Sequence, residues 1–322
     1  NFRGKFLNSF GEGETKVNIK TTLKASVAAA ALFAVAVPVA EAGTVSNGNG
    51  NSVTVSGQIN KAWMYVDDGK SESSAIVDND NSGSRFRILG SGKVNEAVSV
   101  GTALEVEFQD NASNNFQVND TNGDGATTGS VNSSGAAGLS NSANGNSGFG
   151  QTTFAQRRME AFISHKQFGK ISIGQGPTAS DGTAETNLTN AGMAVYGGAT
   201  HFGDVLIRTS DQADSAFGSK RWGLEYTNFD GAGRTDRIRY DSPTFAGFQV
   251  AASTISGGGA DVALRYGGKF GGVAVKAAAS YLNVSSIGSS SGGTTDADGQ
   301  YTISAAAKHD SGLNIRGHYG KR

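Results

Sequence analysis

Hydrophobic and polar residues alternate along much of the chain after residue 52, with the two-residue period of a β-strand. In 53–65, one face carries Val53, Val55, Ile59, Trp63 and Tyr65, and the other carries Thr54, Ser56, Gln58 and Asn60. Lys61 interrupts the apolar row. About eleven segments show this pattern, each near the length with which a tilted strand crosses a membrane. The predicted strands are 53–65, 85–88, 98–109, 157–166, 170–175, 237–241, 248–253, 262–266, 273–281, 301–308 and 313–319.

The connections between these segments differ in length. Tight turns are predicted at 91–96, 167–169, 242–246, 267–272 and 309–312. Long polar stretches are predicted at 67–83, 110–153, 177–234 and 283–299. Within the second of these, 111–150 is rich in Asn, Ser, Gly and Thr and is typical of an exposed loop with little fixed structure.

Alternation alone leaves two orientations open. In a soluble β-sandwich the apolar faces point inward to a core, whereas in an outer-membrane barrel they face lipid and the polar faces line the lumen. The alternating connection lengths, the aromatic residues near strand ends and an N-terminal leader favour the barrel. The predicted fold class is therefore all-β, a transmembrane antiparallel β-barrel that occupies residues 43–322.

The leader begins with Lys20 and Lys24, which precede an apolar run of 13 residues from Val27 to Val39. An Ala-Glu-Ala sequence at 40–42 follows, so 19–42 has the three parts of a secretory signal peptide. The run is too short to span a bilayer as a helix, which takes roughly 20 residues; a buried helix is the alternative. Residues 1–18 are interpreted as an upstream extension without a structural role.

Composition agrees with a water-filled barrel. The 322 residues include 47 glycines and 3 prolines but no cysteine, and only 37% are hydrophobic, which is low for a globular protein of this size. A barrel needs only an outer apolar band. The net charge of −1 argues against a nucleic-acid-binding protein.

Four segments that follow one another in the chain resemble the trimeric, sixteen-stranded general porins of Gram-negative bacteria. They are the opening strand Val53-Thr54-Val55-Ser56-Gly57, the strand start Ser84-Arg85-Phe86, the pair Arg157-Arg158 leading into Phe168-Gly169-Lys170-Ile171-Ser172-Ile173-Gly174, and Arg239-Tyr240-Asp241-Ser242-Pro243-Thr244-Phe245-Ala246-Gly247-Phe248. The last is closely similar to the strand-turn-strand signature of that family. The resemblance covers residues 53–322.

The resemblance implies export through the periplasm, location in the outer membrane, and a homotrimer with contacts to outer-membrane lipid, at which Lys61 could lie in a subunit contact. It also implies sixteen strands in the full protein and a C-terminal strand ending in Phe. Since about eleven strands and no such ending are recognised, we expect a C-terminally truncated fragment that could fail to close or insert.

For the pore, the resemblance implies that the loop 177–234 folds into the lumen as a constriction. Its predicted acidic residues are Asp181, Glu185, Asp204 and Asp211, and its predicted basic wall includes Arg85, Arg157 and Arg234. Strand alternation independently turns Arg85, Arg87, Arg237 and Arg239 inward together with the lumen acids Glu105 and Glu107, because charges are expensive on a lipid-facing surface. Alternation does not decide between Arg157 and Arg158. The alternative is that these arginines merely solvate the wall or pair with Glu105 and Glu107.

No other motif predicts chemistry. Asp120, Asn122 and Asp124 begin like a calcium loop, but the twelfth position is Val131, so a polar turn is the simpler interpretation. The four histidines lack metal-ligand spacing and no nucleophile or phosphate-binding motif occurs, so neither an enzyme nor a cofactor is predicted.

The leading hypothesis is thus a passive pore for small hydrophilic solutes and ions, with at most a weak anion preference. A cell-surface adhesin or structural β-protein without a pore is the main alternative, and an outer-membrane barrel enzyme such as a lipase is a third.

Overall fold

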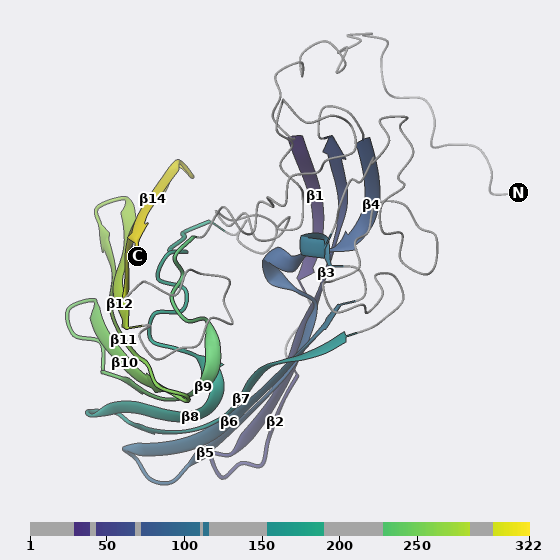
Figure 1. The fold of residues 1–322 in the computed structure, drawn as a ribbon. Helices are drawn as coiled ribbons and strands as arrows, with labels where there is room; N and C mark the ends of the chain where they lie inside the picture. Colours follow the sequence, from purple (N-terminus) through teal and green to yellow (C-terminus); the bar gives the residue numbers. More distant parts are fainter. Residues whose placement is uncertain are drawn as a thin grey trace, which may run out of the picture.

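A computed structural model describes residues 29–38, 43–67, 72–109, 112–115, 153–189, 228–283 and 299–322. These residues form one antiparallel sheet of 14 strands (Figure 1). The strands are β1 (Ala29–Pro38), β2 (Gly43–Ser46), β3 (Ser52–Asp67), β4 (Glu72–Asp78), β5 (Arg85–Lys93), β6 (Val98–Gln109), β7 (Thr153–His165), β8 (Gly169–Pro177), β9 (Arg234–Asp241), β10 (Phe248–Ile255), β11 (Ala260–Phe270), β12 (Val273–Asn283), β13 (Gln300–His309) and β14 (Asn314–Lys321). The described residues also contain two short 3-10 helices, η2 (Asp80–Ser82) and η3 (Ser113–Asn115). In the described part of the chain, no helix has the length and apolar character needed to cross a membrane.

All eleven predicted strands are present, as β3 and β5 to β14. From β5 to β14 each strand pairs with the next one in the chain, so successive connections alternate between the two ends of the sheet. One end carries only short turns, at 94–97, 166–168, 242–247, 271–272 and 310–313. From β5 to β14, the other end carries the long connections, except for the tight turn 256–259 between β10 and β11.

The two faces of the sheet differ as an outer-membrane barrel requires. Bulky apolar side chains are exposed on one face, among them Ile173 (57% exposed) and Ile238 (49%). On the opposite face of the same strands, charged residues such as Arg237 are buried (5% exposed). A soluble sandwich would have the reverse arrangement. We call the apolar face the outer face and the polar face the inner face.

Aromatic residues lie on the outer face near both ends of the strands. At the end with the long connections, Trp63 stacks on Tyr65 and Tyr301 contacts Tyr319, with ring centroids 6.2 and 6.5 Å apart. At the turn end, Tyr266 lies between other aromatic rings, 4.6 Å from that of Phe248. Aromatic residues at the two ends of an apolar band are typical of membrane barrels.

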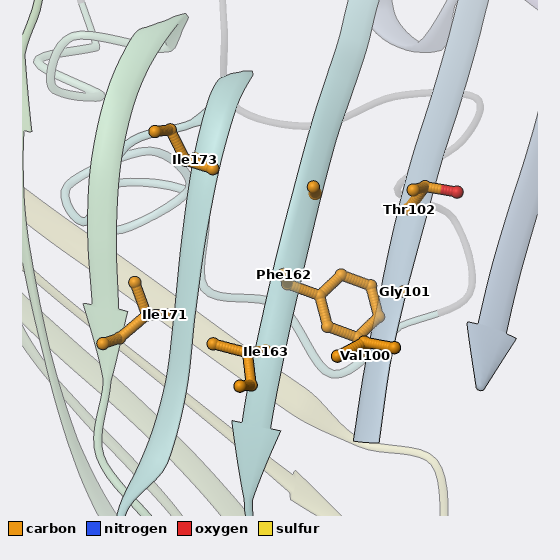
Figure 2. A pocket seen from close by; sticks show the side chains of 8 residues that line it. Val100, Gly101, Thr102, Phe162, Ile163, Ile171 and Ile173 are labelled. Carbon is orange, nitrogen blue, oxygen red and sulfur yellow. The ribbon is translucent and has the colours of Figure 1, made fainter. Parts of the chain in front are cut away.

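A shallow apolar hollow interrupts the outer face over β6, β7 and β8 (Figure 2). The small Ala161 lies in one row with Thr102 and Ile173 across the three strands. Ile163 and Ile171 form another part of the lining. The outer face therefore stays apolar even where it is hollowed.

The sheet curves into a trough whose two edges are open (Figure 1). Among the described residues, β14 pairs only with β13, and on the far side β1 and β2 pair only with β3. β1 falls inside the predicted signal peptide 19–42 and pairs along its whole length with β3, from Ala29 opposite Asp67 to Pro38 opposite Gln58. Cleavage of this segment stays a prediction, which N-terminal sequencing of the exported protein tests.

Candidate functional site

A cluster of charges covers the inner face of β5, β6 and β7. Its centre is the Glu105 carboxylate, which is 2% exposed. It accepts hydrogen bonds from Arg87 Nε at 2.6 Å, from Arg157 Nε at 2.7 Å and from an Arg85 terminal nitrogen at 3.3 Å. Arg157 also forms an ion pair with Glu107. The structure thus brings together three arginines of the predicted basic wall and both predicted lumen acids, in the paired arrangement that the sequence left open as an alternative.

A β-bulge explains the consecutive arginines of β7. Arg158 lies opposite Glu105, but the next residue pair along β6 joins Val106 to Gln156, so Arg157 is an extra residue in the ladder. Such a bulge lets two neighbouring side chains leave the same face of a strand. Arg157 reaches Glu105, and Arg158 donates from Nε to Glu160 at 3.0 Å, so both arginines point inward.

The arginines of β9 hold the start of the long loop. Arg237 forms an ion pair with Glu160 and donates to the carbonyl oxygens of Pro177 at 3.0 Å and Gly174 at 2.9 Å. Arg239 pairs with Asp241 at 2.6 Å and, like Arg237, donates to the loop backbone. Both side chains lie on the inner face, where their donors fix the chain at the point where it leaves β8.

Arg234, also predicted for the wall, is the first residue of β9 and is exposed. Its charge lies within range of the Arg85 guanidinium, so it adds to the positive potential near the cluster. Lys61, on the outer face of β3, pairs with Asp78 of the same chain at 2.6 Å. That contact accounts for a lysine in an apolar row without a second subunit.

The predicted connection 67–83 is only partly a loop. It contains β4 and then the turn η2, which folds against the charged cluster. Gln109 Nε2 joins the two, because it donates to Asp80 at 2.8 Å and to Glu107 at 2.9 Å. Arg85 donates to Ser82 Oγ at 2.6 Å. Burial and the nearby charge of Glu107 raise the pKa of Asp80.

The described parts of the long loop, 177–189 and 228–233, lie on the inner face of β10 to β14. The Ala179 N–H donates to Ser253 Oγ at 2.6 Å, and the Ser180 N–H donates to Asp261 at 2.8 Å. Further along, the Thr183 and Ser280 hydroxyl oxygens are 2.6 Å apart. The described parts of the loop thus cross successive strands on the inner face, and the predicted role of 177–234 as a constriction stays a prediction.

Small side chains on the wall leave room for this crossing. The inner faces of β10 to β13 carry Ala251, Ser253, Ala263, Ala278, Ser280, Thr302, Ser304 and Ala306. The Ser304 hydroxyl also binds the loop: it donates to the Thr183 carbonyl oxygen at 2.6 Å, and its oxygen lies 2.6 Å from Thr186 Oγ1. Arg316 of β14 donates to the Ala184 carbonyl oxygen at 3.3 Å.

Of the predicted loop acids, Asp181 and Glu185 lie in the segment that crosses the inner face, and Asp204 and Asp211 lie outside the described residues. Asp230 was not singled out from the sequence. Its carboxylate accepts the N–H groups of Gly182 and Ala184, both at 2.9 Å, and so ties the two described parts of the loop together. Burial, followed by the charges of Glu185 and Asp181, raises the pKa of Asp230 to about 8.

Sequence reasoning also missed Glu160, Asp261 and Arg265. Strand alternation carried a signal for the last two, since Asp261 and Arg265 flank the outward Val262 and Leu264. The possible calcium loop at Asp120, Asn122 and Asp124 lies outside the described residues. Within the described ranges, no group of three or more acidic or histidine residues could hold a metal ion.

Comparison with known proteins gives the family. The model of the Gram-negative porin family matches residues 25–321. Among solved structures, the chain is similar to in-vitro folded OmpT, an outer membrane protein of Vibrio cholerae, with 16% identity and a TM-score of 0.44. The match covers 84% of this chain and 64% of OmpT. A loop L8 deletion mutant of OmpT gives the same identity and TM-score and is covered to 69%. No curated protein matches. The chain belongs to the Gram-negative porin family and is an outer-membrane protein.

Proposed function

We propose that this porin is a passive diffusion pore for small hydrophilic solutes and ions and has no catalytic function. The observation that carries the proposal is the sidedness of the sheet, with apolar residues exposed on the outer face and charged or hydroxyl residues on the inner face. In a membrane, the outer face contacts lipid and the inner face surrounds water.

The trough is the wall of a closed barrel in this proposal. An open sheet edge presents N–H and C=O groups that lipid cannot satisfy, so the membrane-spanning form must have both edges paired. Three such barrels form the homotrimer that the family resemblance implies.

Fixed charges on both sides of the lumen determine which ions pass. The inner wall holds Arg85, Arg87, Arg157, Arg158, Arg237, Arg239, Arg265 and Arg316 against Glu105, Glu107, Glu160, Asp241 and Asp261. The loop adds the acids Asp181 and Glu185. Because these acids and those of the wall neutralise most of the arginine charge, we expect a weak anion preference at most.

Planar-bilayer recording tests the pore. We expect uniform stepwise increases in current, and a small reversal potential of anion-selective sign across a salt gradient. Liposome swelling should fall as the sugar in the medium becomes larger. A protein that gives no current steps would be the adhesin or structural protein of the alternative hypothesis, and clear cation selectivity would refute the anion preference.

Cysteine labelling tests the sidedness directly, because the chain has no cysteine of its own. Gln249 and Val250 are neighbours in β10 that face inward and outward, respectively. In membranes, a charged thiol reagent should react with a Gln249→Cys variant and reduce its conductance. The matched Val250→Cys variant should stay unlabelled, and labelling of both at equal rates would contradict the proposal.

A further inference from the structure

Two charged residues of one strand hold the same short piece of the loop. Asp261 and Arg265 both point inward from β11, and the loop segment Ala179–Asp181 lies between them and the lumen. The Asp261 carboxylate accepts the N–H of Ser180 at 2.8 Å, its hydroxyl at 2.5 Å and the N–H of Ala179 at 3.2 Å. It therefore binds the donors of this segment.

Arg265 binds the acceptors. One of its terminal nitrogens donates to the carbonyl oxygen of Ala179 at 2.7 Å and to that of Asp181 at 2.9 Å. The Asp261 carboxylate binds the N–H groups of the segment and the Arg265 guanidinium binds its carbonyl oxygens. Together these bonds leave the segment little freedom to rotate or to slide along the wall. Hydrogen bonds to charged groups are also roughly twice as strong as the neutral ones elsewhere along the loop.

The loop segment Ala179–Asp181 also makes apolar packing contacts with the inner wall. The Ala179 methyl group is fully buried and packs against Ala251 and Ala263 on the inner wall, which are 0% and 1% exposed. Ala251 and Ala263 lie opposite each other on the adjacent strands β10 and β11. Asp261 and Arg265 lie two residues before and two residues after Ala263 in β11. The contact therefore fixes both the height of the loop above the wall and its position along it.

We propose that Asp261 and Arg265 are positioning residues for permeation: they fix the loop on the inner wall and so define the free cross-section of the pore. The effect on permeation rests on the proposed function above. The effect on loop position does not, because it follows from the contacts alone. The two parts are therefore tested by separate measurements.

Disulfide cross-linking measures the loop position without any current. The Thr183 and Ser280 side-chain oxygens are 2.6 Å apart, so a Thr183→Cys, Ser280→Cys protein carries the only two thiols of the chain close to bonding distance. We expect rapid, nearly complete disulfide formation. Addition of Asp261→Ala and Arg265→Ala should slow it several-fold, whereas Asp310→Asn, in an exposed turn, should leave it unchanged.

Single-channel recording measures the consequence. Wild type should give one step size, and the Asp261→Ala, Arg265→Ala protein should give noisy openings of many sizes. Oxidation of the cysteine pair in that background should restore the single step, which a purely electrostatic role of the two residues would not do. If the double variant does not fold, Asp261→Asn keeps the volume and should show a smaller increase in noise.

The outcomes separate the two claims. Unchanged cross-linking rates in the Asp261 and Arg265 variants would overturn the positioning role, whatever the channel does. Altered cross-linking with no current from any protein, wild type included, would leave the loop anchor standing and overturn the pore. Altered cross-linking with a wild-type step size would overturn the link between loop position and permeation.

Discussion

The two halves of the inner wall fill the trough in different ways. On β5 to β9 the wall consists of long arginine and glutamate side chains, which pair across neighbouring strands around Glu105 and Glu160. On β10 to β13 the wall consists mainly of alanine, serine and threonine, and the loop backbone takes the space that long side chains occupy on the other half. The comparison shows that the described loop segments lie over the strands whose inner-face side chains are small, where a backbone has room to pack.

Among the substitutions on β5 to β9, replacement of Glu105 should reduce the stability most. In Glu105→Gln, the guanidinium groups of Arg85, Arg87 and Arg157 lose the carboxylate that they share. The strands still hold these three positive charges close to one another. Loss of one partner from a buried ion cluster costs about 3 kcal/mol. We expect the midpoint of urea unfolding to fall accordingly and the reversal potential to become more anion-selective.

The matched control for this experiment is Glu96→Gln. Glu96 pairs with Lys93 at 2.6 Å, but its side chain is 88% exposed in a turn, so its loss should be nearly neutral. Equal unfolding midpoints for the Glu105 and Glu96 variants would mean that the charged cluster does not stabilise the wall.

Filling the small-residue half should displace the loop. Ala263 is 1% exposed beneath Ala179, so Ala263→Leu adds three carbon atoms where the loop is seated. Overpacking of this kind costs about 2 kcal/mol. Urea unfolding should report the loss, and the Thr183–Ser280 disulfide should form more slowly.

The same substitution on the outer face provides the control. Ala305 of β13 is exposed on the apolar side, so Ala305→Leu should change neither the stability nor the cross-linking rate. If the disulfide formed at the wild-type rate in Ala263→Leu, the packing of Ala179 on Ala263 would not be what holds the loop in place.

The sequence predicted more of the charged half of the inner wall, on β5 to β9, than of the half with small side chains, on β10 to β13. Alternation alone turns Arg85 and Arg87 inward, since Phe86 and Ile88 must face outward. It failed at Arg157 and Arg158, because a bulge changes the parity within a strand and leaves no simple sequence signal. The family resemblance implied that the loop enters the lumen. Its seat depends on contacts such as Ser180 with Asp261, 81 residues apart, which alternation does not encode.

The acid that ties the loop together should make the stability of the small-residue half depend on pH. Asp230 has a pKa raised from 3.8 to about 8, chiefly by burial and then by Glu185 and Asp181. The folded state therefore holds a proton that the unfolded state releases. Stability from this group is fully present below pH 4 and is lost as the pH rises to about 8.

Urea unfolding at a series of pH values checks this dependence. In Asp230→Asn the side chain is always neutral, so the decrease in unfolding free energy between pH 4 and 8 should become smaller than in wild type. Parallel pH profiles for the two proteins would show that Asp230 does not titrate in this range.

The smallest effect concerns which arginine of the charged half interacts with permeating anions. The side chain of Arg87 is 35% exposed, whereas that of Arg237 is 2% exposed and bonded to Glu160 and to loop carbonyls. Because Glu105 keeps Arg85 and Arg157, Arg87→Gln should leave the unfolding midpoint nearly unchanged, a loss below about 1 kcal/mol, while the reversal potential shifts slightly toward cations. Arg237→Gln should behave in the opposite way, with a clear loss of stability and little direct effect on selectivity. If the two variants shifted the reversal potential equally, exposure to the lumen would not be what decides which fixed charges the ions sense.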